Sequence, residues 1–107
     1  MKYIPAKNVL SPKGSFHLVR VLSDPGPSTD DAGKVSYACG FWEGRPVIVT
    51  RWNGSDEFPI GNPQSRGLPV WFVIDDNLYP FLVPFFEKIA PGHVEFLRGF
   101  LALKQAA

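Results

Sequence analysis

The sequence predicts an α+β fold in which the strands come first along the chain and the helices come last. Short segments rich in Val, Ile, Leu and Phe fill its earlier part, while apolar residues recur at helical spacing near its end. Between two of the strand-like segments lies Glu43-Gly44, a pair typical of a tight hairpin turn. Because strands and helices do not alternate, the order favours an antiparallel sheet with two or three helices packed on one face over parallel βαβ units.

We expect about four strands, at residues 16–22, 35–42, 46–52 and 70–74. The first is largely apolar on both faces, which indicates a central strand or one that is buried on both sides. A two-residue turn fixes the register of the second and third strands, so that Cys39 lies opposite Ile48 and Val35 lies opposite Trp52.

This register divides the hairpin into two faces. The face expected to meet the core carries Val35, Tyr37, Cys39, Phe41, Ile48 and Trp52. The opposite face is small and polar at the end where Ser36 meets Arg51. Trp42, beside the turn, is expected to be partly exposed.

Two helical segments follow, at residues 76–90 and 93–105. Asp75 or Asp76 is a suitable N-cap for the first. Pro84 predicts a kink in that helix, or a fresh helix starting there. The last helix is apolar over about half its circumference, which is wider than the roughly 100° stripe of an ordinary surface helix. Such an arc can cover the core of its own chain and also contact a second subunit. The expected interface residues are Phe96, Phe100 and Leu103.

Two segments are expected to lack regular structure. Residues 1–15 form an N-terminal arm with a turn at 11–14, and the polar run at 24–33 forms a mobile loop.

Composition limits the class of protein. The chain has 107 residues, which suits a single domain. Its formal net charge of +1 makes broad electrostatic binding of nucleic acid unfavourable. Cys39 is the only cysteine, so no intrachain disulfide can form, and a reducing, cytoplasmic location is expected. We find no signal-peptide pattern and no apolar run near the roughly 20 residues of a membrane span, so no membrane partner is expected.

The patterns that carry common chemistries are missing. Cys39, His17 and His93 are not at metal-ligand spacing, so no metal site is expected. No serine lies in a Gly-x-Ser-x-Gly elbow and no glycine-rich phosphate loop occurs, so we assign no catalytic residue and expect no cofactor. Asp56 and Glu57 remain as a carboxylate pair for acid–base work, although a solvated turn explains them more simply.

Residues 51–69 form the segment in which we expect a ligand site. The connection is long, joins two strands and concentrates polar groups, which is typical of functional loops. Its arginines suit a carboxylate or phosphate, and Trp52, together with Trp71 just beyond the segment, can stack on a ligand. The candidate ligand-binding residues are Arg51, Trp52, Asn53, Asn62, Gln64, Ser65, Arg66 and Trp71. In the structural alternative, Arg51 pairs with Asp56 or Glu57 and the polar side chains satisfy the loop backbone.

The same segment carries a resemblance. The motif consists of Arg51-Trp52-Asn53-Gly54, then Gly61-Asn62-Pro63-Gln64-Ser65-Arg66-Gly67-Leu68-Pro69, then Trp71-Phe72. This resembles a signature of small uncharacterised bacterial proteins, some of them encoded on mobile elements such as integron gene cassettes. The resemblance covers about a fifth of the chain and implies no activity, cofactor or catalytic residue.

Four functions remain open at this stage. The leading hypothesis is a non-enzymatic binding or interaction module that forms a homo-oligomer, with a dimer favoured because closed two-fold dimers are commonest. The alternative is a small-molecule site, for a possibly anionic ligand, built by residues 51–69. An enzyme with Asp56 or Glu57 as its acid or base ranks third, and nucleic-acid binding is disfavoured by the net charge.

Overall fold

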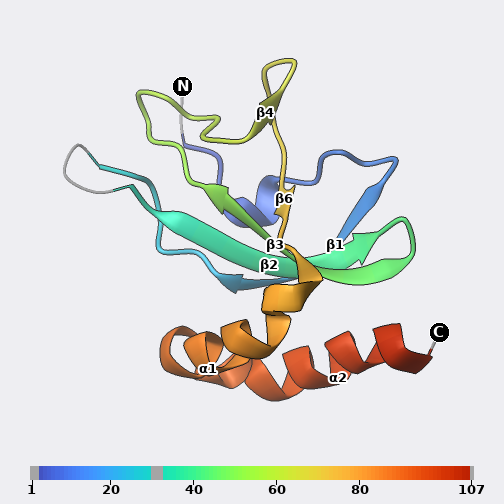
Figure 1. The fold of residues 1–107 in the computed structure, drawn as a ribbon. Coiled ribbons are helices and arrows are strands. Elements are labelled where there is room, and N and C mark those ends of the chain that lie inside the picture. The colour runs from blue at the N-terminus through green and yellow to red at the C-terminus, as the bar shows by residue number, and fades with distance from the viewer. Residues whose placement is uncertain (1–2, 30–32, 107) are drawn as a thin grey trace.

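The computed structural model describes residues 3–29 and 33–106, and it confirms the α+β prediction. Four strands form one antiparallel sheet in the order β1-β2-β3-β6. Their bounds are Phe16–Ser23 for β1, Val35–Trp42 for β2, Arg45–Trp52 for β3 and Phe72–Val73 for β6. Helices α1 (Tyr79–Ile89) and α2 (Val94–Ala106) lie together beneath the sheet in Figure 1, and the N-terminal arm lies on the other side.

The central hairpin of β2 and β3 has the predicted register. Cys39 faces Ile48 and Val35 faces Trp52 across the strands. Glu43 and Gly44 both have positive φ, of 49° and 84°. Two left-handed residues in a two-residue turn match the right-handed twist of the strands, and this explains why the sequence fixes the register here.

Strand β1 lies at the edge of the sheet, and only Phe16 and Leu22 within it are buried, so the expectation of a central strand or one buried on both sides is wrong. Its pairing with β2 shifts between Leu18 and Arg20, which leaves Val19 as an extra residue. A bulge of this kind changes which face the following side chains point to. Apolar residues therefore appear on both faces of the segment although the strand is not in the middle.

The fourth strand is shorter than expected. Only Phe72–Val73 pairs regularly with β3, whereas Val70 makes an isolated parallel bridge to Ser11 in the N-terminal arm. The segment before it also contains a small hairpin that was not predicted, formed by β4 (Gln64–Ser65) and β5 (Leu68–Pro69). Its turn residues Arg66 and Gly67 have positive φ.

The helices begin and end close to the predicted residues. A 3₁₀ turn at Asp76–Leu78 leads into α1, and the Asp75 side chain caps it by accepting from the backbone N–H of Asn77 at 3.0 Å. α1 runs through Pro84 to Ile89, so no new helix begins at that proline. Pro84 has no N–H, so the helix lacks the hydrogen bond from residue 84 to the carbonyl of Pro80. Pro80 is exposed, so water can bond its carbonyl instead.

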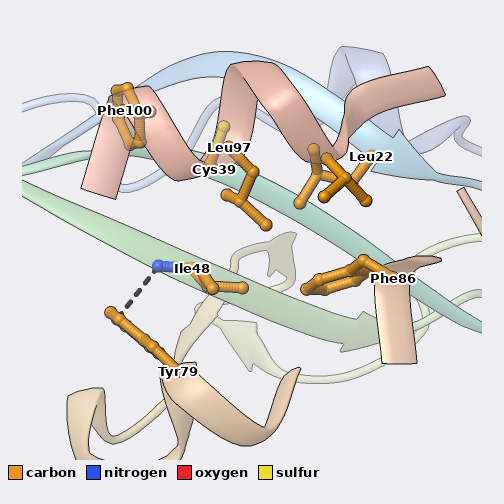
Figure 2. Close-up of a cluster of buried hydrophobic side chains, with 8 residues drawn as sticks. Leu22, Cys39, Ile48, Tyr79, Phe86, Leu97 and Phe100 are labelled. Atoms are coloured by element: carbon orange, nitrogen blue, oxygen red, sulfur yellow. Dashed lines mark hydrogen bonds between the residues drawn. The ribbon is translucent and has the colours of Figure 1, made fainter. Parts of the chain in front are cut away.

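Two apolar clusters lie on opposite faces of the sheet. The first joins the predicted core face of the hairpin to both helices, through Leu22, Cys39, Ile48, Tyr79, Phe86, Val94, Leu97 and Phe100 (Figure 2). The second lies beneath the N-terminal arm and contains Ala6, Val9, Phe16, Ala38, Val47, Val49 and Trp71. The sheet is thus covered on both faces, by helices on one side and by irregular chain on the other.

The arm contains more structure than predicted. A 3₁₀ turn, Ala6–Asn8, places Ala6 and Val9 in the second cluster. Of the loop at 24–33 that was expected to be mobile, residues 30–32 lie outside the described residues, and Ser28 is tied down by a hydrogen bond from its hydroxyl to the carbonyl of Asn53 at 2.8 Å.

Candidate functional site

Arg51, one of the two arginines expected to bind a ligand, is buried. Its guanidinium donates hydrogen bonds to the backbone carbonyls of Ile60 and Val70. Ile60 lies near the middle of the long connection and Val70 near its end, so one side chain holds two distant points of the connection against β3. Burial lowers the pKa of Arg51. The expected pairing with Asp56 or Glu57 is absent from the ion pairs of the described residues, and the charge of Arg51 faces carbonyl oxygens inside the protein.

Asn53 is also buried, and both the nitrogen and the oxygen of its side-chain amide are hydrogen-bonded within the protein. Its Nδ2 donates to the carbonyl of Gly26 at 2.7 Å and to Asp24 at 3.1 Å, while its Oδ1 accepts from the Ser36 hydroxyl at 2.6 Å. Asp24 in turn accepts from the Tyr3 hydroxyl at 2.9 Å. This network connects the hairpin, the following loop and the N-terminal arm.

Asp24 is the centre of that network. Burial alone would raise the pKa of its carboxyl group, but hydrogen bonds from the backbone N–H groups of Gly26 and Ala6 and from the Tyr3 and Ser36 hydroxyls together outweigh burial and lower the pKa. The polar end of the hairpin, where Ser36 meets Arg51, is therefore part of a structural network in which Ser36 and Asn53 are buried and Asp24 lies at the surface.

The other polar candidates do not converge on one cavity. Asn62 pairs through its backbone with Trp52, and the Gln64 amide donates to the carbonyl of Gly61 at 3.0 Å. Ser65 and Arg66 are exposed on the β4–β5 hairpin, which stands away from the sheet in Figure 1. Trp71, one of the two tryptophans among the candidate residues, is buried in the second cluster. Its indole N–H donates to the carbonyl of Val9 at 2.6 Å.

The carboxylate pair does not have the geometry that acid–base catalysis needs. Asp56 and Glu57 are both exposed, and Asp56 accepts from the backbone N–H of Tyr3 at 3.1 Å. Arg51, which would have to meet them in a cleft, points to the two carbonyls described above. Within residues 3–29 and 33–106, no three His, Cys, Asp or Glu side chains gather as metal ligands would.

An apolar groove lies on the helix side of the sheet, where the hairpin ends beside α1. Its volume is about 620 Å³. The groove is lined by Val35, Tyr37, Thr50, Arg51, Trp52, Pro63, Phe72, Ile74, Leu78 and Leu82. Trp52 is 56% exposed and Phe72 is also exposed, which was not expected of Trp52 on a core face. Trp52 lies at the last position of β3.

Helix α1 continues this apolar surface. Leu78 ends the 3₁₀ turn before α1, and Phe81, Phe85 and Ile89 lie within the helix. The four recur three or four residues apart, so they lie along one side. We call these four residues the α1 face. All four are exposed, Phe81 to 75%. Leu78 also lines the groove, and the ring of Phe85 lies 5.4 Å from that of Tyr37 in the groove wall. The groove and the α1 face therefore form one continuous surface.

Helix α2 uses most of its wide apolar arc inside the protein. Phe100, an expected interface residue, is buried with its ring 5.1 Å from that of Phe41. The ring of Phe96 lies under the Arg20 guanidinium at 3.7 Å and stacks on Phe100 at 5.8 Å. Only Leu103 of the expected three is well exposed, at 51%.

The sequence pattern indicated α2, and not α1, as the source of exposed apolar surface, although a signal for α1 was present. Between Tyr79 and Ile89 only Glu87 and Lys88 are charged, so α1 is apolar on nearly every side. A short helix of that kind cannot bury all of its surface against one sheet and one neighbouring helix.

Searches of protein-family models, of curated proteins and of solved structures find no match to this chain. None of the helices that the structure describes is long and apolar enough to cross a membrane.

Proposed function

We propose that this protein is a non-enzymatic binding module. It assembles with copies of itself, and the dimer is its working form. The observation that carries the proposal is that most of the apolar surface of α1 is left uncovered by the rest of the chain. This helix is apolar on nearly every side, yet only Tyr79 and Phe86 within it are buried. Contiguous exposed apolar surface on a small protein marks an interaction site.

The residue types on this surface support a protein partner. Aromatic side chains dominate the centres of protein interfaces, and here Trp52, Phe72, Phe81 and Phe85 are exposed on one continuous surface. Charged residues are depleted at such centres. Glu87 turns away from the α1 face, because its carboxylate accepts from Arg98 of α2 at 2.7 Å.

A pair of matched substitutions tests this surface against the one expected from the sequence. Phe81→Glu should raise the dissociation constant of the dimer by roughly 100-fold or more, because it places a charge at the centre of the interface. Leu103→Glu, at an exposed apolar site on α2, should leave assembly unchanged. Light scattering on a sizing column gives the mass of each variant.

Both sites are exposed in the single chain, so neither substitution should change the stability of the monomer by more than about 0.5 kcal/mol. Thermal melting checks this at a concentration below the dissociation constant of the dimer, where assembly does not add to the stability. If Phe81→Glu keeps the wild-type mass, the proposed surface is wrong. If Leu103→Glu alone dissociates, the interface belongs to α2.

A second candidate function, binding of a small molecule, is favoured by the groove. Its volume of about 620 Å³ lies within the range of small-molecule sites, and its walls are mainly apolar and aromatic. These walls suit an uncharged ring better than the anionic ligand first expected, because the Arg51 guanidinium is occupied by carbonyls. Mass beyond whole chains in a native mass spectrum would support this candidate.

A further inference from the structure

We infer that two copies of the chain pair α1 against α1 in antiparallel orientation around a two-fold axis. This inference rests on the proposed function and specifies its partner and its geometry. It is carried by three features: the order of side chains along the α1 face, the charges at the two ends of the helix, and the area that a stable pair needs.

The α1 face is nearly symmetric along its length. It reads aliphatic, aromatic, aromatic, aliphatic, as Leu78, Phe81, Phe85 and Ile89. When a second copy is turned end for end, Leu78 meets Ile89 of the other chain and Phe81 meets Phe85. Aromatic rings then pack on aromatic rings at the centre, with aliphatic side chains at both ends. A two-fold interface requires this self-complementarity, since the same surface contributes both sides.

The charges decide between the antiparallel and the parallel arrangement. Asp75 and Asp76 lie at the N-terminal end of α1, and Lys88 lies at its C-terminal end beside the α1 face. A parallel pair would bring acid to acid and lysine to lysine. An antiparallel pair brings the acidic end of each helix to the Lys88 end of the other and opposes the two helix dipoles favourably.

A stable pair needs more surface than the α1 face alone provides. A stable interface buries about 800 Å² on each partner, out of the 6641 Å² that this chain exposes. Four side chains on one short helix supply only part of that area. Trp52 and Phe72 lie on the same continuous surface and extend it, so we expect the second copy to cover the mouth of the groove as well.

Cysteine cross-linking tests the orientation directly. Leu78→Cys and Ile89→Cys are made separately, and each is checked for dimer formation by light scattering. In an antiparallel pair the two different positions meet, whereas two copies of the same position lie about 16 Å apart along the helices, beyond the roughly 7 Å between Cα atoms that a disulfide spans. Native Cys39 does not interfere, because it is buried and burial raises the pKa of its thiol to about 11.

Mild oxidation should therefore cross-link an equal mixture of the two variants and leave each variant alone unlinked. Cross-links within each variant alone would show a parallel pair and overturn the inference while the proposed function stands. Absence of any cross-link between variants that do dimerise would also overturn it. If Phe81→Glu also retains the wild-type mass, the proposed function fails separately.

A second measurement uses the unmodified chain, so it does not depend on the cysteine variants assembling. A carbodiimide joins ammonium and carboxylate groups that touch, and a mixture of isotopically light and heavy protein separates links between chains from links within one chain. The antiparallel pair predicts links between Lys88 of one chain and Asp75 or Asp76 of the other. A dimer that yields no such link contradicts it.

Discussion

At the scale of single residues, the polar side chains that looked most suited to bind a ligand serve to hold the chain together. Arg51 fastens the long connection through the carbonyls of Ile60 and Val70. Asn53 joins the hairpin to the loop at Gly26 and to Asp24. Each of these groups is buried with its hydrogen bonds satisfied, which is the condition under which burial of a polar group does not destabilise a protein.

Asp24→Asn should lower the free energy of unfolding at pH 7 by about 1–2 kcal/mol. In the wild type, Asp24 accepts five hydrogen bonds, from Tyr3, Ala6, Gly26, Ser36 and Asn53. An asparagine amide carries a donor in place of one acceptor, so in either orientation it sets a donor against a donor. Urea titration of both proteins measures the difference.

The pH dependence of that difference identifies the carboxylate as its cause. The pKa of Asp24 is lowered in the folded protein from its ordinary value of 3.8. A carboxyl group whose pKa is lowered by folding stabilises the folded protein at pH values above its ordinary pKa. That stability is lost as the pH falls through the folded-state pKa. The advantage of the wild type over Asp24→Asn should therefore shrink when the urea titration is repeated near pH 3. A constant difference would contradict this role.

The sequence could not separate these structural roles from ligand binding. Arg, Asn and Asp are the residue types of both, and only burial distinguishes them. The burial of Arg51 depends on a connection that folds back over it from Ile60 to Val70, and no local pattern predicts that path.

At the scale of elements, the junction between the sheet and α1 depends on one tyrosine. β6 pairs with β3 over two residues only. Beyond them, the backbone N–H of Ile74 donates to the carbonyl of Ile48 at 2.9 Å, but the return bond is replaced by the Tyr79 hydroxyl. That hydroxyl accepts from the Ile48 N–H at 3.0 Å, as Figure 2 shows, and donates to the Ile74 carbonyl at 3.0 Å.

Tyr79→Phe should lower the free energy of unfolding by about 1–3 kcal/mol, because it leaves the buried N–H of Ile48 without its acceptor. Amide hydrogen exchange provides a local readout that a general loss of stability would not reproduce. The Ile48 amide should lose more protection than its neighbours Val47 and Val49. Uniform change along β3 would show that the hydroxyl does not complete the ladder.

Elements set by local chemistry were predictable, and elements set by distant contacts were not. The hairpin register follows from two turn residues, Glu43 and Gly44. The apolar pattern of β1 indicates a central or doubly buried strand, because the bulge at Val19 hides the alternation of an edge strand. β6 is short because its continuation is taken over by Tyr79, a residue outside the strand.

At the scale of the whole molecule, the sheet is enclosed unevenly. Both faces carry a buried cluster, yet the helix side ends in the open groove and the α1 face. The sequence predicted the helix layer, because its apolar spacing is regular. It did not predict that the N-terminal arm covers the other face, because Ala6 and Val9 belong to an irregular segment without periodicity.

The open surface also follows from this unequal enclosure. α2 packs into the core through Val94, Leu97 and Phe100, so its apolar arc is largely consumed. α1 packs through Tyr79 and Phe86 and leaves its other apolar side uncovered. The central claim of this account is that a second copy of the chain covers that side.

A native mass spectrum of the purified wild-type protein tests this claim most directly. The account predicts a principal species at twice the 11.9 kDa of one chain, which returns to one chain in Phe81→Glu. A wild-type protein that remains a single chain at high micromolar concentration would contradict self-assembly, and the α1 face would then have to bind a different macromolecule.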